Sequence, residues 1–344
     1  MTDAVSMVTM SDVAKVAGVS ATTVSHVLNK SRRIDPETER AVLAAIESTG
    51  YVNDRVARSL RTGKTKTIGL AISAISNPYF GDVVHAIEKR VTANGHSLLL
   101  ADTHDDPSYE LRAVTHLLAH RPDGILIAPS SDPHEALTRI ARRRIPTVLI
   151  DRVSPDIGSW SFDAVGVENA GPTAELVEHL IGFGHRRIGM VAGRAGLQTT
   201  IERVAGFREG HRRRGVPLDE RYIVDGGAGA GDAVDGLLSL PAPPTALVMG
   251  NNQATIDAVR RLTERGIAIP GEISIASFDD FAWADLFHPR LTAIRQPVDE
   301  LGERAVAMLF ERMDDPGQPA RTVRLAPTLI ERDSAAPPSQ EART

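Results

Sequence analysis

Three polar residues in the second half of the chain have types and positions that suit the binding of a hydroxylated small molecule. Arg203 stands in ERVAGF, Asn251 in MGNNQ and Asp279 in FDD, and each lies beside an apolar segment or at the start of a helical one. An aspartate accepts hydrogen bonds from adjacent hydroxyl groups, and an arginine donates hydrogen bonds in a fork. A structural ion pair or a helix cap explains the same residues, so both interpretations stand at this level.

Other patterns that could support chemistry are incomplete. The glycines of GGAGAGDA (226–233) resemble a dinucleotide-binding fingerprint, but Asp232 occupies the position of its third glycine, which favours a flexible loop. His116 and His120 lie four residues apart on a predicted helix without a Glu partner or a third ligand, which favours a solvated helix face. The chain has no cysteine and lacks a nucleophile elbow and a phosphate loop. The sequence therefore predicts no catalytic residue, no metal and no cofactor.

Alternating strands and helices must position the polar residues. Strands are expected at 68–72, 97–101, 124–128 and 147–151, and the same rhythm restarts at 188–192, 222–224, 246–250 and 273–277. Apolar strands separated by segments of helix length predict parallel sheets with crossover helices, here in two open α/β lobes. Ligands of such sheets bind beyond the carboxyl ends of the strands, so the residues that follow the strands are further candidates. They are Asn77, Tyr79, Phe80, Asp102 and Arg152.

The first 50 residues predict three short helices. Each has a capping residue before it, and a glycine follows the first and the third. The caps are Thr9, Ser20 and Asp35, and the glycines are Gly18 and Gly50. The apolar residues expected to face inward are Val13, Val16, Ala17, Val24, Val27, Leu28, Val42, Leu43 and Ile46. The tight turn at 18–20 joins the first two helices into a helix-turn-helix.

The second of these helices has a surface that suits DNA. Ala21, Thr22, Ser25 and His26 lie on the face away from Val24 and are small or polar, so the helix can enter a major groove. An ordinary solvated face more often carries Lys and Glu. The basic residues that flank the helix and could contact phosphates are Lys30, Arg32, Arg33 and Arg55.

The distribution of charge supports a nucleic-acid partner for one end only. The whole chain of 344 residues has a net charge of -5. Residues 1–66 hold ten Lys or Arg against seven Asp or Glu, a net +3, and the remainder holds 29 against 37, a net -8. A basic end on an acidic body is expected where only that end meets phosphate. No signal peptide and no apolar segment of membrane length is apparent, so we expect a cytoplasmic protein with no membrane partner.

The chain resembles the lactose-repressor (LacI/GalR) family of transcription regulators. The segment SDVAKVAGVSATTVSHVLNKSRRIDPETERAVLAAIESTGYVNDRVARSL is similar to the DNA-binding headpiece of that family, especially to its purine-repressor members. The resemblance continues through SNPYF, RPDGILI, GHRRIGMVAG, RVAGF, FDD and PRLTAIRQP, and it spans residues 10–332.

The resemblance implies a set of DNA contacts. They come from Thr9, Ser11, Ser20, Ala21, Thr22, Thr23, Ser25, His26, Asn29, Lys30, Arg32, Val56, Ala57, Leu60 and Arg61. Residues 21, 22 and 26 match positions that read bases, although Ala21 departs from the larger polar residues often found there and offers only a methyl contact. Residues 56–60 match a hinge helix that forms on the operator, pairs with its dimer mate and wedges Leu60 into the minor groove. Without the resemblance, so short a segment would be a plain linker.

The resemblance also assigns a role to the polar residues of the second half. Arg203, Asn251 and Asp279 match positions that hold a small effector, a sugar or a related metabolite. Many relatives have an aromatic residue near the position of Ala228, where this chain has only small residues, and Trp283 or Trp160 could supply the missing face. These residues are compatible with an effector that releases the protein from DNA and with one that tightens its binding to DNA. They are also compatible with a protein corepressor.

We therefore expect an all-α helix-turn-helix headpiece followed by an α/β domain of two parallel-sheet lobes, like that of periplasmic binding proteins. The headpiece should span residues 1–52, the hinge helix and linker 53–66, the two-lobed domain 67–332 and a disordered tail 333–344. The function expected is a homodimeric repressor that binds near-palindromic double-stranded operator DNA under the control of a small effector. An exported solute receptor would need a signal sequence, and an α/β enzyme would need the motifs that are missing.

Overall fold

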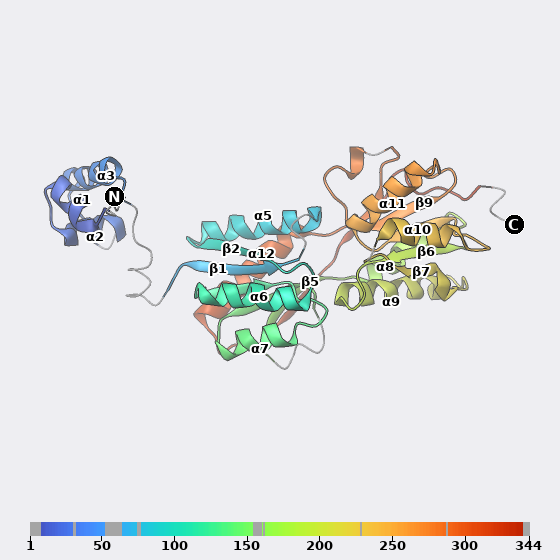
Figure 1. The fold of residues 1–344 in the computed structure, drawn as a ribbon, viewed down its shortest axis with the longest axis horizontal. Helices are drawn as coiled ribbons and strands as arrows, with labels where there is room; N and C mark the ends of the chain where they lie inside the picture. The colour runs from blue at the N-terminus through green and yellow to red at the C-terminus, as the bar shows by residue number, and fades with distance from the viewer. Residues whose placement is uncertain are drawn as a thin grey trace, which may run out of the picture. The chain divides into compact units, whose positions relative to one another are not determined.

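The computed structural model describes residues 8–29, 32–51, 64–73, 77–153, 160, 162–227, 229–286 and 288–339. These residues form two compact units, Met1–Thr65 and Lys66–Thr344 (Figure 1). Each unit has its own hydrophobic core.

The first unit consists of three helices, as the sequence predicts. They are α1 (Met10–Ala17), α2 (Ala21–Asn29) and α3 (Pro36–Thr49). Thr9 and Asp12 form a reciprocal cap, in which each side chain accepts a hydrogen bond from the backbone N–H of the other residue. Gly18 ends α1 in the left-handed conformation with φ 66°, and the Ser20 Oγ accepts from the Thr23 N–H at 3.1 Å. The helix-turn-helix prediction is therefore confirmed.

The core of this unit is narrower than the sequence predicts. Val13, Val24 and Val42 are fully buried, but Val16 is 61% exposed and Leu43 is 51% exposed. In a bundle of three short helices, each helix buries only a narrow stripe of its surface against the other two. Leu43 lies about 100° around the helix from Val42 and therefore falls outside this stripe. The expectation that Val16 and Leu43 face inward is wrong.

The second unit contains two lobes with the same strand order. In the first lobe the order is β11-β5-β4-β3-β1-β2, and in the second it is β12-β10-β9-β8-β6-β7. The strands of the first lobe are β1 (Thr67–Ile72), β2 (Ser97–Asp102), β3 (Gly124–Ile127), β4 (Thr147–Asp151), β5 (Asp163–Val167) and β11 (Thr322–Leu325). Those of the second are β6 (Ile188–Ala192), β7 (Ile223–Asp225), β8 (Ala246–Met249), β9 (Ser274–Phe278), β10 (Thr292–Arg295) and β12 (Thr328–Ile330). Neighbouring strands are parallel except for β10 and β12.

Helices cover both faces of each sheet. In the first lobe, α5 (Pro78–Ala93) and α12 (Val298–Asp314) pack on one face, and α6 (Pro107–Ala119) and α7 (His134–Arg142) on the other. In the second lobe, α8 (Ala170–Gly182) and α9 (Gln198–Arg213) lie opposite α10 (Ala230–Leu238) and α11 (Asn252–Glu264). The chain passes between the lobes after β5, β10 and β11, so both lobes are built from discontinuous segments (Figure 1).

The eight strands expected from the sequence are all present, with bounds shifted by one residue at most. The four strands that the sequence analysis missed are β5, β10, β11 and β12. They have only three to five residues, and two of them carry an arginine, Arg295 or Arg324. Length alone does not distinguish them, because the expected strands β3, β7 and β8 also have three or four residues. The arginines interrupt the apolar pattern of β10 and β11, so these strands are not recognisable locally.

The expectation of a disordered tail is wrong for the residues just after Asp333. Ser334 is fully buried, and its Oγ accepts from the Thr292 N–H at 2.8 Å and donates to the Ile275 carbonyl at 2.6 Å. Ala336 accepts a hydrogen bond from the buried His185 Nε2 at 2.9 Å. Small side chains let this segment approach β9 closely. The same alanine and serine content that suggests disorder makes the docking sterically feasible.

We expect His185 to make the stability of the second lobe sensitive to acid. Burial lowers the pKa of His185 below its ordinary value of 6.5. The unfolded chain then binds the proton more readily, so stability that is present above pH about 6.5 is lost as the pH falls below it. The loss contributed by one histidine is at most about 1.4 kcal/mol per pH unit. Melting temperatures between pH 7.5 and 5 should fall less steeply in His185→Gln than in the unaltered protein.

The control for this prediction is His116→Gln, because His116 is exposed on α6. That substitution should leave the slope of melting temperature against pH unchanged. Equal slopes for the His185→Gln variant and the unaltered protein would contradict the assignment.

Candidate functional site

The exposed face of α2 carries small and polar side chains over a buried apolar face. Ala21 and Thr22 are exposed and His26 is partly exposed, whereas Val24 and Val27 are buried. This amphipathic arrangement leaves a surface without bulky side chains that could approach another molecule closely.

The other residues predicted to contact DNA divide into two groups. Those that the structure places at the surface, fully or partly exposed, are Thr9, Ser11, Ser20, Thr23, Ser25 and Arg32. Lys30, Val56, Ala57, Leu60, Arg61 and the side chain of Asn29 lie outside the described residues. Arg32, Arg33 and His26 line one surface hollow of about 260 Å³. Positive charge therefore stands at one end of the α2 surface.

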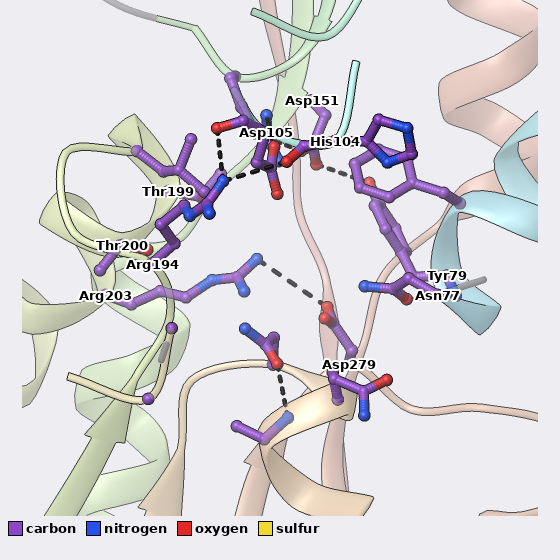
Figure 2. A pocket seen from close by; sticks show the side chains of 18 of the residues that line it. Asn77, Tyr79, His104, Asp105, Asp151, Arg194, Thr199, Thr200, Arg203 and Asp279 are labelled. Carbon is purple, nitrogen blue, oxygen red and sulfur yellow. Dashed lines mark hydrogen bonds and ion pairs between the residues drawn. The ribbon is translucent and has the colours of Figure 1, made fainter. Parts of the chain in front are cut away.

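A cavity of about 320 Å³ lies between the two lobes of the second unit, at the carboxyl ends of strands from both sheets (Figure 2). Of the residues predicted to bind an effector, those that line it are Asn77, Tyr79, Phe80, Arg152, Arg203, Asn251 and Asp279. The structure therefore brings together seven side chains that are far apart in the sequence.

Asp279 and Arg203 form the second lobe's side of this cavity. Asp279 follows β9 with φ 75°, and its Oδ1 accepts a hydrogen bond from the Gln296 Nε2 at 2.5 Å. The Arg203 guanidinium lies 3.6 Å above the Phe278 ring, and its Nη2 stands 3.9 Å from the Asp279 Oδ1. Arg203 also donates to the Asn169 Oδ1 at 2.9 Å and to a backbone carbonyl. The fork is thus held in place before any ligand arrives.

Asp151 forms the first lobe's side, and the sequence analysis missed it. It is the last residue of β4, has φ 66° and accepts a hydrogen bond from the Tyr79 hydroxyl at 2.7 Å. Burial raises the pKa of Asp151 above its ordinary value, and burial also raises the pKa of Tyr79. Arg152, the residue predicted instead, turns to the Asp105 Oδ1 at 2.5 Å. The rule about strand ends applied here to Asp151 as well, because it ends the segment TVLID.

Asn77 and Asn251 have a structural role in addition to lining the cavity. The Asn77 Oδ1 caps α5 by accepting from the Tyr79 N–H at 3.0 Å, and the Asn251 Oδ1 caps α11 by accepting from the Ala254 N–H at 2.8 Å. The helix-cap interpretation is therefore right for Asn251. These caps use only the side-chain oxygens, so the caps themselves do not occupy the NH₂ donors.

Two predicted effector residues lie outside the cavity lining. Asp102 instead accepts a hydrogen bond from the His104 N–H at 2.8 Å and shapes the turn after β2. Trp283 packs on Phe281 with ring centroids 4.4 Å apart, and Trp160 packs on His134. Asp102 was predicted because it follows a strand, but the direction of a side chain in a turn depends on backbone angles. The two tryptophans were predicted as a replacement for the aromatic residue missing near Ala228, and neither lines the cavity. Among the described residues that line the cavity, the aromatic rings are those of Tyr79, Phe80 and His104.

Further lining residues, which the sequence analysis did not predict as effector contacts, come from loops, from the end of β4 and from the first turns of α9 and α11. They are His104, Asp105, Asp151, Arg194, Leu197, Thr199, Thr200, Gly226, Gly227, Gln253, Ala254 and Asp257. The glycine-rich segment is not a loop throughout, because α10 already begins at Ala230. Gly226 allows a close approach, since a Cβ there would lie 2.5 Å from the Ala192 carbonyl oxygen. The candidate site thus combines polar side chains with backbone that only glycine permits.

The described part of the chain lacks both a metal-binding cluster and a membrane-spanning helix. No cluster of three or more His, Asp or Glu side chains there could hold a metal ion. Within the same ranges, no helix is long and apolar enough to cross a membrane.

Comparisons with known proteins match both units. Residues 9–54 match the model of bacterial regulatory proteins of the lacI family, and residues 177–335 match the periplasmic binding protein-like domain. The repressor PurR of Pectobacterium carotovorum is 35% identical over 96% of this chain and 97% of its own length. The ribose operon repressor of Escherichia coli K12 is 34% identical over 96% of this chain and 100% of its own length.

A solved structure is similar over nearly the whole chain as well. The lac repressor dimer, bound to operator and the anti-inducer ONPF, superimposes with a TM-score of 0.83 at 27% identity. The match covers 96% of this chain and 99% of the other.

Proposed function

The chain belongs to the lacI family of bacterial regulatory proteins, and on that premise we propose that its first unit reads an operator while its interlobe cavity binds a small effector that controls DNA affinity. It is a DNA-binding transcription regulator and not an enzyme.

The observation that carries the effector proposal is the pair of buried aspartates on opposite lobes. Asp151 is the last residue of β4 and Asp279 directly follows β9, and both strands are central in their sheets. Both aspartates have a left-handed backbone and line the same cavity. Two carboxylates that face one space from two sides can accept hydrogen bonds from hydroxyl groups at both ends of one ligand. A ligand with hydroxyl groups along its length fits this arrangement.

The charge of the cavity favours a neutral effector. Among the described residues that line it, four are aspartates and three are arginines. Arg152 already pairs with Asp105, and Arg203 stands beside Asp279. A sugar acid or a sugar phosphate would meet no surplus of positive charge. We therefore propose a sugar-like polyhydroxylated effector, and the similarity to a ribose operon repressor makes ribose the first probe.

On the DNA side, we propose that α2 lies in the major groove of the operator. Thr22 and His26 would contact base edges, Ala21 would offer a methyl contact, and Arg32 would contact a phosphate. We propose a cytoplasmic homodimer in which the first unit of each protomer reads one half of a near-palindromic site. The similarity to a repressor dimer whose structure was solved on its operator supports this proposal. Leu60 is proposed as the minor-groove wedge of the hinge.

The two sites are coupled in this proposal. An effector that prefers one arrangement of the lobes changes operator affinity, and bound operator must change effector affinity by the same factor. Footprinting on DNA upstream of the protein's own coding sequence tests the proposal, with monosaccharides, sugar acids, nucleosides and purines added in turn. Lack of any protection at low salt by a folded, dimeric sample would contradict it.

Replacing His26 by Ala is expected to weaken binding to the operator by about 1–3 kcal/mol, because one base contact is lost. Binding to unrelated DNA should stay unchanged, since it depends on phosphate contacts. Fluorescence anisotropy at several salt concentrations measures both affinities.

Arg32→Ala is the matched control for this prediction. It should weaken binding to both kinds of DNA and reduce the slope of log affinity against log salt by about one. If His26→Ala instead weakened both kinds of DNA equally, His26 would not read bases.

A further inference from the structure

One arginine of the cavity lining connects the two lobes by hydrogen bonds. Arg194 lies on the loop after β6, in the second lobe, and it is exposed. Its Nη1 donates to the His104 carbonyl at 3.1 Å and to the Asp105 carbonyl at 2.7 Å, both in the first lobe (Figure 2). All three residues line the cavity, and we call them the cavity mouth. A charged group therefore connects the lobes at the lining of the space that would hold an effector.

The first lobe holds the two acceptors in place independently of Arg194. His104 and Asp105 both have a left-handed backbone, with φ of 51° and 53°. The Asp102 Oδ1 accepts from the His104 N–H at 2.8 Å, and the Asp105 carboxylate is 2.5 Å from the Arg152 Nη1. The carbonyls thus converge on one point without help from the guanidinium. Docking onto such a preformed pair of acceptors loses little conformational freedom.

The loop that carries Arg194 is packed closely from both sides. A Cβ at Gly227 would lie 2.9 Å from the Arg194 Cα, so only glycine leaves room for the loop there. Gly196 has φ 84°, and a Cβ on it would lie 3.0 Å from the Ser131 Cβ of the first lobe. This loop therefore approaches the first lobe at both Arg194 and Gly196.

We propose that Arg194 determines effector specificity by size: its guanidinium closes the cavity mouth over the effector and excludes molecules that extend beyond the cavity. This inference rests on the proposed binding of an effector in the interlobe cavity. A ligand that reaches past Asp105 occupies the path of the guanidinium and separates it from both carbonyls. Loss of even one charge-assisted hydrogen bond corresponds to about tenfold or more in the closing equilibrium. An enclosed ligand leaves both bonds intact.

The test uses the absence of cysteine from the chain, which makes an introduced thiol unique. Thr200→Cys places the thiol inside the cavity, because Thr200 lines it and is only 8% exposed (Figure 2). The rates of alkylation by iodoacetamide, which is small, and by fluorescein maleimide, which is bulky, are measured on the full chain without effector. Combining Thr200→Cys with Arg194→Ala should raise the maleimide rate by about tenfold or more and the iodoacetamide rate much less.

Two controls accompany this measurement. Arg194→Lys retains a donor that can reach the carbonyls and should restore slow reaction with the maleimide. Thr263→Cys reports on an exposed position of α11, where neither rate should depend on residue 194. The proposal would be overturned if the ratio of maleimide to iodoacetamide rate at Cys-substituted position 200 were the same with Arg and with Ala at position 194. It would also be overturned if the maleimide reacted with neither of these two proteins.

A binding experiment separates this proposal from the proposed function. Ribose and adenosine, which carries a base on the same ring, are titrated into the unaltered protein and Arg194→Ala. We expect the ratio of ribose to adenosine affinity to fall by about tenfold in the variant. An unchanged ratio contradicts size selection. Failure of both proteins to bind any sugar contradicts the effector class, and the alkylation ratio then still decides whether Arg194 closes the mouth.

Discussion

Asp163→Asn is expected to lower the free energy of unfolding of the first lobe by about 3–5 kcal/mol, because it leaves a buried arginine without its counter-charge. Asp163 is fully buried at the start of β5. Its two oxygens accept from the Arg312 Nε and Nη2, each at 3.0 Å, and the Arg321 N–H donates to the Oδ1 at 2.8 Å. Arg312 belongs to α12, the helix that the chain contributes to the first lobe after leaving the second.

Urea denaturation followed by tryptophan fluorescence measures this effect. The two tryptophans lie in different lobes, so Trp283→Phe leaves Trp160 as the reporter of the first lobe. The comparison is made in that background because the lobes need not unfold together. Glu220→Gln is the control, since its pair with Arg208 at 2.7 Å is exposed and contributes about 1 kcal/mol or less. If Asp163→Asn and Glu220→Gln lowered the free energy of unfolding equally, burial would not determine the contribution of the Asp163–Arg312 pair to stability.

The sequence predicted the parts of the fold that depend on local patterns. Apolar strands of the second unit and capped helices of the first are encoded by neighbouring residues, and they are present. The docking of residues 334–336 depends on an opening beside β9 that only the folded lobe creates. Leu43 could likewise not be distinguished from the buried Val42 next to it. Which of the two side chains is buried depends on how the other helices pack against α3. Non-local packing is the information that one sequence does not display.

The candidate site shows the same limit at the level of single side chains. Asp279 was found because it follows a strand, but Asp102 also follows that rule and turns away. What aims Asp151 and Asp279 into the cavity is a left-handed backbone, with φ of 66° and 75°. Aspartate tolerates that conformation but does not require it, so its presence leaves no signature in the sequence. A glycine in the same position would have been noticed.

Asp279→Asn is expected to weaken effector binding by about 2–5 kcal/mol, which is roughly thirtyfold to several thousandfold. The change keeps the size of the side chain, its tolerance of a left-handed backbone and an oxygen that can accept from Gln296. It removes the charge that accepts strongly from ligand hydroxyl groups, and it leaves Arg203 in the cavity beside a neutral amide. Titration calorimetry with whichever sugar binds the unaltered protein measures the loss, and Asp219→Asn, in an exposed pair with Arg221, is the control.

The effect of Asp279→Asn on DNA distinguishes a binding residue from a structural one. Because coupling between the sites is reciprocal, a variant that no longer binds effector should bind operator with the affinity of the effector-free protein at every sugar concentration. Effector-free operator affinity itself should not change, since Asp279 lies within the second unit and the DNA-reading helix α2 belongs to the first. If the variant bound the sugar normally, the effector would have to occupy a place other than this cavity. If it bound neither sugar nor operator, Asp279 would support the fold of the regulator rather than recognise its ligand.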